Sequence, residues 1–292
     1  MIDPAGATAK GGDIALLISD IDGTLVTPEK LLTPAAAAAL RSLAEAGVGF
    51  TLVSSRSRHG MEALVAKLGV RLPFAAFNGG SLVAPDLTLF EAPRLAPNVA
   101  LTMLGLLAQR EVEAWVFAAG DWRLRDPDRP NVAREIVTVG FHPMVVTGFE
   151  DVIDRIDKIV GVSNNFALLA RVESEARVLA GKQAAIARSQ SYYLDITHPQ
   201  ANKGHAVTAL CKRIGVELHR TAVIRDAFHD VAMFQKGGFS IAMGQAPDAV
   251  KAHAAVVALS NNEDGFASAV ERFILPHAAR LTVLEFQRRR QV

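Results

Sequence analysis

The sequence is poor in cysteine and nearly balanced in charge. One of its 292 residues is a cysteine, Cys211, so no internal disulfide can form, as is typical of a reducing cytoplasm. The 31 basic and 30 acidic residues leave a formal net charge of +1, which argues against a nucleic-acid-binding surface. No apolar run approaches the roughly 18 residues of a membrane span. We therefore expect a cytoplasmic globular protein, monomeric or homodimeric, without nucleic-acid or membrane partners.

The sequence also lacks internal repeats and a recognisable zinc motif. Its histidines show no metal-ligand spacing, which favours surface positions over a zinc site. Residues 1–12 contain no apolar segment after a basic start, so they are predicted to form a flexible extension and not a secretion signal.

The chain does contain two carboxylates directly after an apolar run. Residues 14–18, Ile-Ala-Leu-Leu-Ile, predict a buried parallel strand, and residues 20–25 are Asp-Ile-Asp-Gly-Thr-Leu. The carboxyl ends of such strands are where open α/β sheets bind ligands. In phosphoryl transfer, Asp20 can attack phosphorus while Asp22 donates a proton to the departing oxygen. Gly23 lets the backbone turn sharply and approach a phosphate or a metal.

This segment has two other interpretations. Asp-Gly is a strong hairpin signal, so residues 22–23 are also compatible with a plain turn between strands. A calcium loop of EF-hand type would need an acidic residue at Thr24 and a glutamate at its end, and the sequence has neither.

Helix and strand signals alternate at both ends of the chain. Thr33, Pro34 and Gly47 predict a helix over 34–46, and further segments predict a strand at 48–53, a helix at 58–68 and a strand at 74–77. The same rhythm returns with a helix from Lys203 and strands at 221–224, 239–243 and 255–259. This alternation predicts an α/β fold with a doubly wound, Rossmann-like parallel sheet.

The middle of the chain has a different pattern. Helices near 98–110 and within 166–179 alternate with strands near 112–117 and 156–162, and both tryptophans, Trp115 and Trp122, fall here. We expect an α+β domain at 85–190, inserted into a core domain made of 13–84 and 191–292. Both tryptophans are expected to pack in its core.

Four separated segments are expected to meet at one edge of the parallel sheet. They contribute Asp20 with Asp22, Ser54, Lys203, and Asp226 with Asp230. A carboxylate can approach a phosphate dianion only where positive charge offsets the repulsion, and Mg²⁺ and a lysine would supply that charge. Hard oxygen ligands such as Asp20, Asp226 and a backbone carbonyl suit Mg²⁺.

In the order and spacing of these motifs the chain resembles the haloacid dehalogenase superfamily, and within it the Cof-type phosphatases of subclass IIB. Residues 20–25 match the first motif, residues 54–57 (Ser-Ser-Arg-Ser) the second, and residues 202–204 (Asn-Lys-Gly) the third. Residues 77–80 match the Asn-Gly segment that precedes the cap, while 242–246 and 260–265 resemble the closing segments. The inserted domain would then be a C2B-type cap.

The resemblance implies a role for each matching residue. Asp20 would be the nucleophile and Asp22 the general acid and base, with Ser54 and Lys203 as the other catalytic groups. The phosphate would be bound by Lys203 and by five further residues, Gly23, Ser55, Arg56, Asn78 and Gly79. The Mg²⁺ site would involve Asp20, Asp22 and Asp226, with Asp230 supporting it from outside the ligand set. The substrate would be a small phosphate ester, with a sugar phosphate as the leading candidate.

The fourth motif departs from the family pattern. The chain has Arg225 where a glycine is usual and His229 where an amide is usual, although Asp226 and Asp230 are present. Arg225 could point away from the site or place a cation beside the metal and weaken its binding. Two alternatives to a phosphohydrolase therefore stay open, a ligand-binding protein of low or no activity and a phosphotransferase or mutase that uses the same site.

Overall fold

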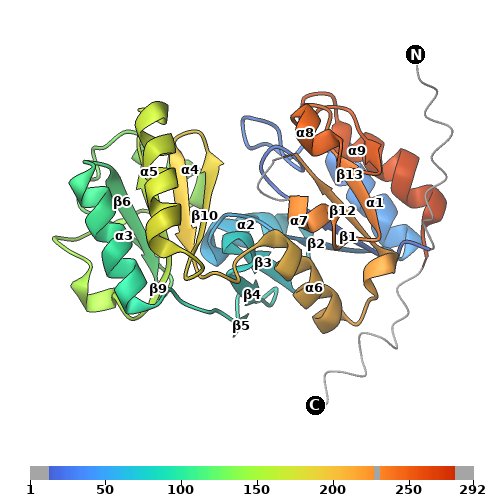
Figure 1. The fold of residues 1–292 in the computed structure, drawn as a ribbon. Helices are drawn as coiled ribbons and strands as arrows, with labels where there is room; N and C mark the ends of the chain where they lie inside the picture. Colours follow the sequence, from blue (N-terminus) through green and yellow to red (C-terminus); the bar gives the residue numbers. More distant parts are fainter. Residues whose placement is uncertain (1–12, 227–230, 280–292) are drawn as a thin grey trace. The chain divides into compact units, whose positions relative to one another are not determined.

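The structure, a computed structural model, describes residues 13–226 and 231–279. The described chain forms two compact units (Figure 1). The first contains 13–54, 65–74 and the described residues from 203 onward, and the second contains 55–64 and 75–202. The predicted domain limits at 84 and 190 stay a prediction, because compactness does not mark where an insertion begins. The predicted extension at 1–12 lies outside the described residues.

The first unit is built on a parallel sheet, which confirms the predicted fold class. Its strand order is β14 (Val256–Val257), β13 (Phe239–Ala242), β12 (Thr221–Arg225), β1 (Leu16–Ser19) and β2 (Gly49–Leu52). Every neighbouring pair is parallel. All four residues of β1, which lies between β12 and β2, are buried, as expected for a strand covered on both faces.

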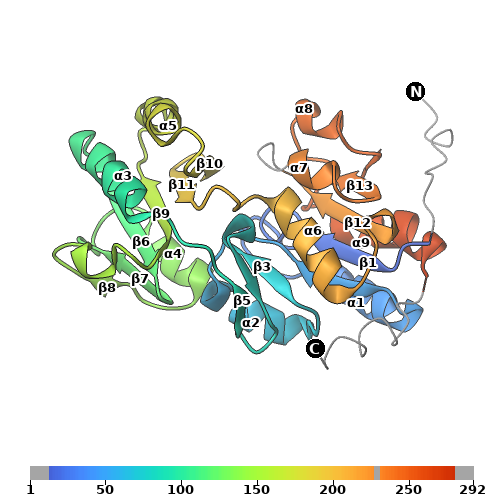
Figure 2. The same cartoon turned by 60° about the horizontal axis from the view of Figure 1, so that its bottom comes forward.

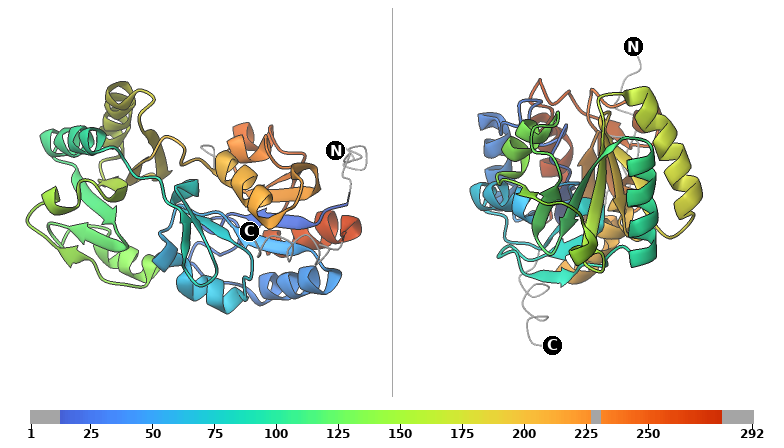
Figure 3. Two further views of the ribbon diagram at one scale, coloured as in Figure 1. Left: turned by 90° about the horizontal axis from the view of Figure 1, so that it is seen from below. Right: turned by 90° about the vertical axis from the view of Figure 1, so that its left-hand side faces the viewer.

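Helices cover both faces of this sheet. Figures 2 and 3 show α6 (Lys203–Ile214) on one face and α1 (Pro34–Ala46) on the other. Thr33 caps α1 by accepting a hydrogen bond from the Ala36 N–H, and Gly47 ends it at φ 78°. The described residues of this unit also form α7 (Val231–Phe234), α8 (Asp248–Lys251), α9 (Gly265–Ala269), a π-helical turn at Val270–Ile274 and 3-10 turns at Leu218–Arg220 and Leu275–His277.

The predicted position of the strand at 74–77 in the parallel sheet is wrong. β3 (Phe74–Ala76) belongs to a separate three-stranded sheet with β4 (Ser81–Val83) and β5 (Leu89–Glu91). After β3 the 3-10 turn Phe77–Gly79 has positive φ at all three residues, 50°, 57° and 93°. This tight turn leads straight into β4, so β3 joins a sheet with the strands that follow it in the chain.

The second unit contains a six-stranded sheet. Its order is β10 (Ala185–Gln190), β11 (Tyr193–Thr197), β9 (Ile156–Val162), β6 (Glu113–Ala118), β7 (Asp121–Leu124) and β8 (Met144–Val145). All neighbours are antiparallel except β7 and β8. α3 (Pro97–Gln109) and α5 (Phe166–Ala180) cover one face (Figure 3, right). The unit also contains α2 (Arg58–Leu68), which it shares with the first unit, α4 (Val132–Val139) and a 3-10 turn at Glu150–Val152.

Successive side chains of these strands point to opposite faces of the sheet, so the unit has one hydrophobic core on each face. Val116 and Ile159 pack with α3 and α5, whereas Trp115 and Val160 pack on the opposite face with α4. The exposed fractions of Trp115 and Trp122 are 0% and 1%, which confirms the prediction that both lie in the core.

A largely buried carboxylate in β9 makes the stability of this unit depend on pH. Burial raises the pKa of Asp157 to about 6 although Arg94, whose Nε lies 3.9 Å away, opposes the shift. Because the folded state binds this proton more tightly than the unfolded state, Asp157 destabilises the fold above pH 6, and this cost disappears as the pH falls toward 4. The stability advantage of Asp157→Asn over wild type should shrink by about 2 kcal/mol between pH 7 and pH 4 in urea unfolding. A constant difference would contradict the raised pKa.

Among the described residues, no helix is long and apolar enough to cross a membrane.

Candidate active site

Strand register brings three predicted site residues to one edge of the parallel sheet. Ser19 at the end of β1 lies opposite Leu52 in β2 and Ile224 in β12. The Val53 N–H donates to the Ser19 carbonyl at 2.9 Å, and the Asp20 N–H donates to the Ile224 carbonyl at 3.1 Å. The chain therefore leaves these strands at the same level, and Asp20, Ser54 and Asp226 follow at the carboxyl edge.

A buried ion pair holds the Asp20 carboxylate. Lys203 is the first residue of α6, and its Nζ bonds to Asp20 Oδ2, with 3% and 8% of the two side chains exposed. Asp20 Oδ1 accepts the N–H of Ile21 at 2.7 Å. Burial lowers the pKa of Lys203, and Arg225 acts in the same direction, whereas Asp20 opposes the shift. Both oxygens of Asp20 therefore have fixed donors, which orients the carboxylate.

Asp226 lies against the turn that follows Asp20. Its Oδ1 accepts a hydrogen bond from Thr24 Oγ1 at 3.3 Å, and a Cβ at Gly23 would overlap its carboxylate. The pKa of Asp226 is raised to about 6, first by burial and then by the charge of Asp20, while Arg225 and Lys203 oppose the rise. The buried Asp20 and the partly buried Asp226 repel each other, and such a pair of carboxylates favours a divalent cation.

The close packing at Gly23 predicts that Gly23→Ala is severely impaired. At φ 80° a side chain is strained, and the added methyl would displace the Asp226 carboxylate. We expect kcat/KM to fall by about 100-fold or more and more Mg²⁺ to be needed for half-maximal activity.

Gly69→Ala is the matched control for Gly23→Ala. Gly69 also has a positive φ, 61°, but nothing lies within 4 Å of the added Cβ. Equal turnover in the two alanine variants would show that the contact with Asp226 has no catalytic importance.

Arg225 is completely buried beside these carboxylates. It ends β12, none of its side chain is exposed, and its guanidinium carbon lies 5.8 Å from the centre of the Phe234 ring in α7. Burial lowers the pKa of Arg225 to about 10, while Asp20 and Asp226 raise it. Both carboxylates therefore interact electrostatically with the guanidinium. The cation is thus inside the protein and coupled to the site.

Predicted residues His229 and Asp230 lie outside the described residues.

Asp22 has a cationic neighbour that the sequence analysis missed. Lys30 Nζ lies 2.7 Å from Asp22 Oδ1, and 14% of the Asp22 side chain is exposed. Lys30 has φ 65° in the loop between β1 and α1. No motif marks this lysine, because its position depends on how the loop folds back.

Two further polar residues brace the same loop. The side-chain amide of Gln245 donates to the Gly23 carbonyl and its Oε1 accepts the Asn261 N–H at 3.0 Å. Asn261 Nδ2 donates to the Val26 carbonyl at 3.0 Å. Both lie in segments that the sequence analysis matched to the closing segments, but it assigned neither residue a role. They hold the backbone that carries Asp22 and Gly23.

Four predicted phosphate-binding residues belong to the second unit. The Ser55 carbonyl accepts from Lys158 Nζ at 3.2 Å, and an Arg56 guanidinium nitrogen donates to the Thr138 carbonyl at 3.2 Å. Asn78 is 7% exposed at φ 57°, and Gly79 follows at φ 93°. Contacts of Ser55, Arg56, Asn78 and Gly79 with a phosphate at Asp20 therefore stay predictions.

The described residues of the first unit supply only part of a metal's ligand set from their side chains. Within the described residues, no three or more His, Cys, Asp or Glu side chains gather around a point that could hold a metal. Asp20 and Asp226 fit Mg²⁺ nevertheless, since this ion commonly keeps several waters and uses one or two carboxylates. A backbone carbonyl would be the remaining protein ligand.

The fold and this constellation define a haloacid dehalogenase-like protein, and comparison with known families agrees. The model of the haloacid dehalogenase-like hydrolase family matches residues 17–270, so the chain belongs to this family and the predicted resemblance is confirmed.

Known relatives extend over nearly the whole chain. A 5-amino-6-(5-phospho-D-ribitylamino)uracil phosphatase of Bacillus subtilis is 24% identical over 90% of this chain and 97% of its own. An HMP-PP phosphatase of Cronobacter sakazakii is 28% identical over 78% of this chain and 83% of its own. The solved structure of a subclass IIB sugar phosphatase has a TM-score of 0.78 at 19% identity, over 89% of this chain and 99% of its own. The last of these supports the fold, including the C2B-type cap.

Proposed function

We propose that the protein is a Mg²⁺-dependent phosphohydrolase that acts on a small phosphorylated metabolite through an aspartyl-phosphate at Asp20. One observation carries this proposal: Asp20 is oriented by the buried Lys203 and lies beside a second, partly buried carboxylate, Asp226. The Asp20 carboxylate therefore has a fixed orientation and a cation on one side. Two neighbouring carboxylates withdrawn from water would be a costly arrangement without a chemical role.

The reaction would proceed in two steps at Asp20. Its carboxylate attacks phosphorus, the bond between phosphorus and the ester oxygen breaks, and Asp22 gives its proton to the leaving alcohol. Asp22 then takes a proton from water, which attacks the aspartyl-phosphate and releases inorganic phosphate. Lys203 and Ser54 would hold the oxygens of the transferring group. Mg²⁺, when bound to Asp20 and Asp226, supplies positive charge that offsets the repulsion between carboxylate and phosphate.

Small metabolites are the substrate class that the relatives support. One of them is a phosphatase of a phosphorylated ribityl compound, and another is an HMP-PP phosphatase. A sugar phosphate is the first substrate to test, because the alkoxide that leaves from it is strongly basic and needs the proton that Asp22 can give.

A phosphatase panel tests this proposal against the binding-protein alternative. Purified protein is incubated with p-nitrophenyl phosphate and a set of sugar phosphates, with Mg²⁺ or with EDTA. We expect phosphate release that requires Mg²⁺ and disappears in Asp20→Asn. Thermal shifts with sugar phosphates but no release with any of them would instead favour a non-catalytic protein. A phosphorylated acceptor without free phosphate would favour a phosphotransferase.

Because Arg225 places a buried cation beside the two carboxylates, we expect the protein to bind Mg²⁺ more weakly than it would with a neutral residue at this position. Arg225→Met keeps most of the side-chain volume beside Phe234 and removes a charge that both carboxylates feel. Because like charges repel in a medium of low dielectric constant, the Mg²⁺ concentration for half-maximal activity should fall by about tenfold. Turnover at saturating Mg²⁺ should stay within about tenfold of wild type.

Arg272→Met serves as the control for this substitution. Arg272 also lies over a phenylalanine, 5.1 Å from the Phe273 ring, but it is exposed. An unchanged Mg²⁺ requirement in Arg225→Met would mean that the buried guanidinium does not act on the metal site.

A further inference from the structure

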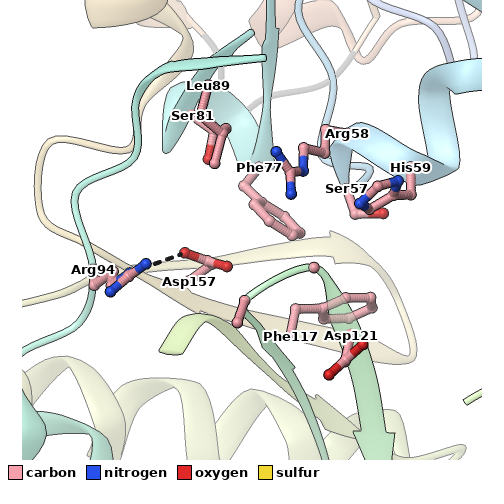
Figure 4. Close-up of a pocket in the computed structure, with 12 residues that line it drawn as sticks. Ser57, Arg58, His59, Phe77, Ser81, Leu89, Arg94, Phe117, Asp121 and Asp157 are labelled. Atoms are coloured by element: carbon pink, nitrogen blue, oxygen red, sulfur yellow. Dashed lines mark ion pairs between the residues drawn. The ribbon is translucent and has the colours of Figure 1, made fainter. Parts of the chain in front are cut away.

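The second unit contains a cavity that shares no residue with the candidate active site. Its volume is about 180 Å³, and its walls come from the start of α2, the β4 and β5 region, the turn between β6 and β7, and Asp157 in β9. Figure 4 shows its arginines, Asp157 and two phenylalanine rings converging on one space. The cavity lies wholly within the second unit, so its geometry is fixed by that unit alone.

Two arginines, Arg58 and Arg94, and two aspartates, Asp121 and Asp157, line this cavity. Asp157 pairs with Arg94 at 3.9 Å, and Asp121 pairs with Arg123 at 3.4 Å. Arg58 donates to the Leu87 carbonyl at 3.0 Å but makes no ion pair with any residue in the described part of the chain. Its guanidinium therefore keeps several donors and a positive charge for a ligand.

The position of Arg58 on its helix adds to this potential. It is the first residue of α2, and Ser57 Oγ accepts the Gly60 N–H at 3.0 Å. The positive end of the helix dipole thus lies at the same wall as the guanidinium. His59, the next residue, lines the cavity as well.

Two aromatic rings form an apolar wall of the cavity. The centroids of Phe77 and Phe117 lie 5.6 Å apart with an interplanar angle of 60°, and Leu89 extends the apolar wall. A flat apolar group can contact both rings with favourable edge and face geometry. A cavity of about 150 Å³ accommodates one benzene ring, so this cavity has room for a ring with a small charged substituent.

Positive φ angles occur at two residues that line the cavity and at Leu87, whose carbonyl accepts from Arg58. Phe77, Leu87 and Ala119 have φ values of 50°, 67° and 54°, which side chains with a Cβ rarely adopt. Phe77 supplies a ring, the Leu87 carbonyl fixes Arg58, and Ala119 forms the turn between β6 and β7 that lines the cavity. Strained residues gather at ligand-binding sites because their geometry is kept there for function.

We propose that this cavity is a second ligand site, which binds a small organic anion with a planar apolar body. The carboxylate or phosphate group of the ligand is held by Arg58, and its body packs against Phe77 and Phe117. Such a ligand would not be a substrate, because none of the predicted catalytic residues lines the cavity. The proposal is independent of the phosphatase activity.

Benzoate is a suitable probe, with benzyl alcohol and benzylamine as controls of the same size and different charge. Backbone amide shifts of the full-length protein are followed during titration with each compound. We expect saturable shifts with benzoate, centred on residues 57–59, 117–121 and 157, at least tenfold tighter than with either control. Shifts centred on residues 20–24 and 226 would place benzoate in the candidate active site and overturn the proposal.

Three variants then test the role of charge. Arg58→Gln should weaken benzoate binding by about tenfold or more, and Arg58→Lys should retain part of the affinity. Arg110→Gln, which removes an exposed arginine that pairs with Glu175 on the surface, should bind like wild type. Equal benzoate affinity in wild type and a folded Arg58→Gln contradicts the proposal. If Arg58→Gln does not fold, the affinities of the wild-type protein for benzoate and benzyl alcohol test the proposal instead. Equal affinities for the two compounds would reject the anion site.

Discussion

Asp20→Asn is expected to reduce phosphate release by about 10⁴-fold or more, because the amide cannot form the acyl-phosphate on which both steps depend. The structure gives this substitution a second effect. The amide would leave Lys203 as a buried ammonium without its carboxylate, so the variant should also unfold at lower temperature. The measurement is turnover of p-nitrophenyl phosphate together with a thermal melt of the same sample.

Asp248→Asn is the control for the nucleophile substitution. Asp248 is a fully exposed carboxylate in α8 that lies 3.6 Å from Lys251. It should leave both turnover and melting temperature unchanged. If Asp20→Asn retained more than about 1% of wild-type turnover, Asp20 could not be the group that attacks phosphorus.

Lys203→Met should have the next largest effect. Removing the ammonium deprives Asp20 of one fixed donor and removes a cation that, together with Arg225, offsets the repulsion between Asp20 and Asp226. We expect kcat/KM to fall by about 10³-fold and stability to fall by about 3 kcal/mol or more. Lys251→Met, which removes a lysine from the surface pair with Asp248, should do neither.

The double variant Asp20→Asn with Lys203→Met separates the structural from the catalytic role of the pair. Because each single substitution leaves the other group buried without its partner, the double variant should be more stable than the sum of the two losses predicts. Its turnover should stay as low as that of Asp20→Asn alone. Additive losses of stability would show that the two side chains do not act as a pair.

Local signals in the sequence predicted much of the fold. α1 begins and ends where Thr33, Pro34 and Gly47 indicate, because capping depends on residues within one turn of the helix. The parallel sheet of the first unit follows from buried strands that alternate with helices. The membership of β3 in another sheet was not predictable in the same way, since it depends on the turn at Phe77–Gly79 and on pairing beyond the strand itself.

The sequence predicted those residues of the candidate site that belong to recognisable motifs. It did not predict neighbours that come from segments without a motif and meet the site only in the folded chain. The contact between Asp20 and Lys203 spans 183 positions and was expected only because both residues belong to an ordered set of motifs. Lys30 beside Asp22 and the bracing by Gln245 carry no signal in the local sequence. The same holds for Arg225, whose direction depends on the space beside Phe234.

The central claim is that Asp20 becomes phosphorylated during turnover, and acid quenching followed by peptide mass spectrometry tests it most directly. The protein is mixed with p-nitrophenyl phosphate and Mg²⁺, because this substrate has a leaving group that needs little protonation. Asp22→Asn, which cannot activate water efficiently, should accumulate the intermediate. The account predicts the mass of one phosphoryl group on the peptide that contains Asp20. Phosphate release with an unmodified Asp20 under conditions that preserve acyl-phosphates, or a phosphoryl group on another residue, would contradict it.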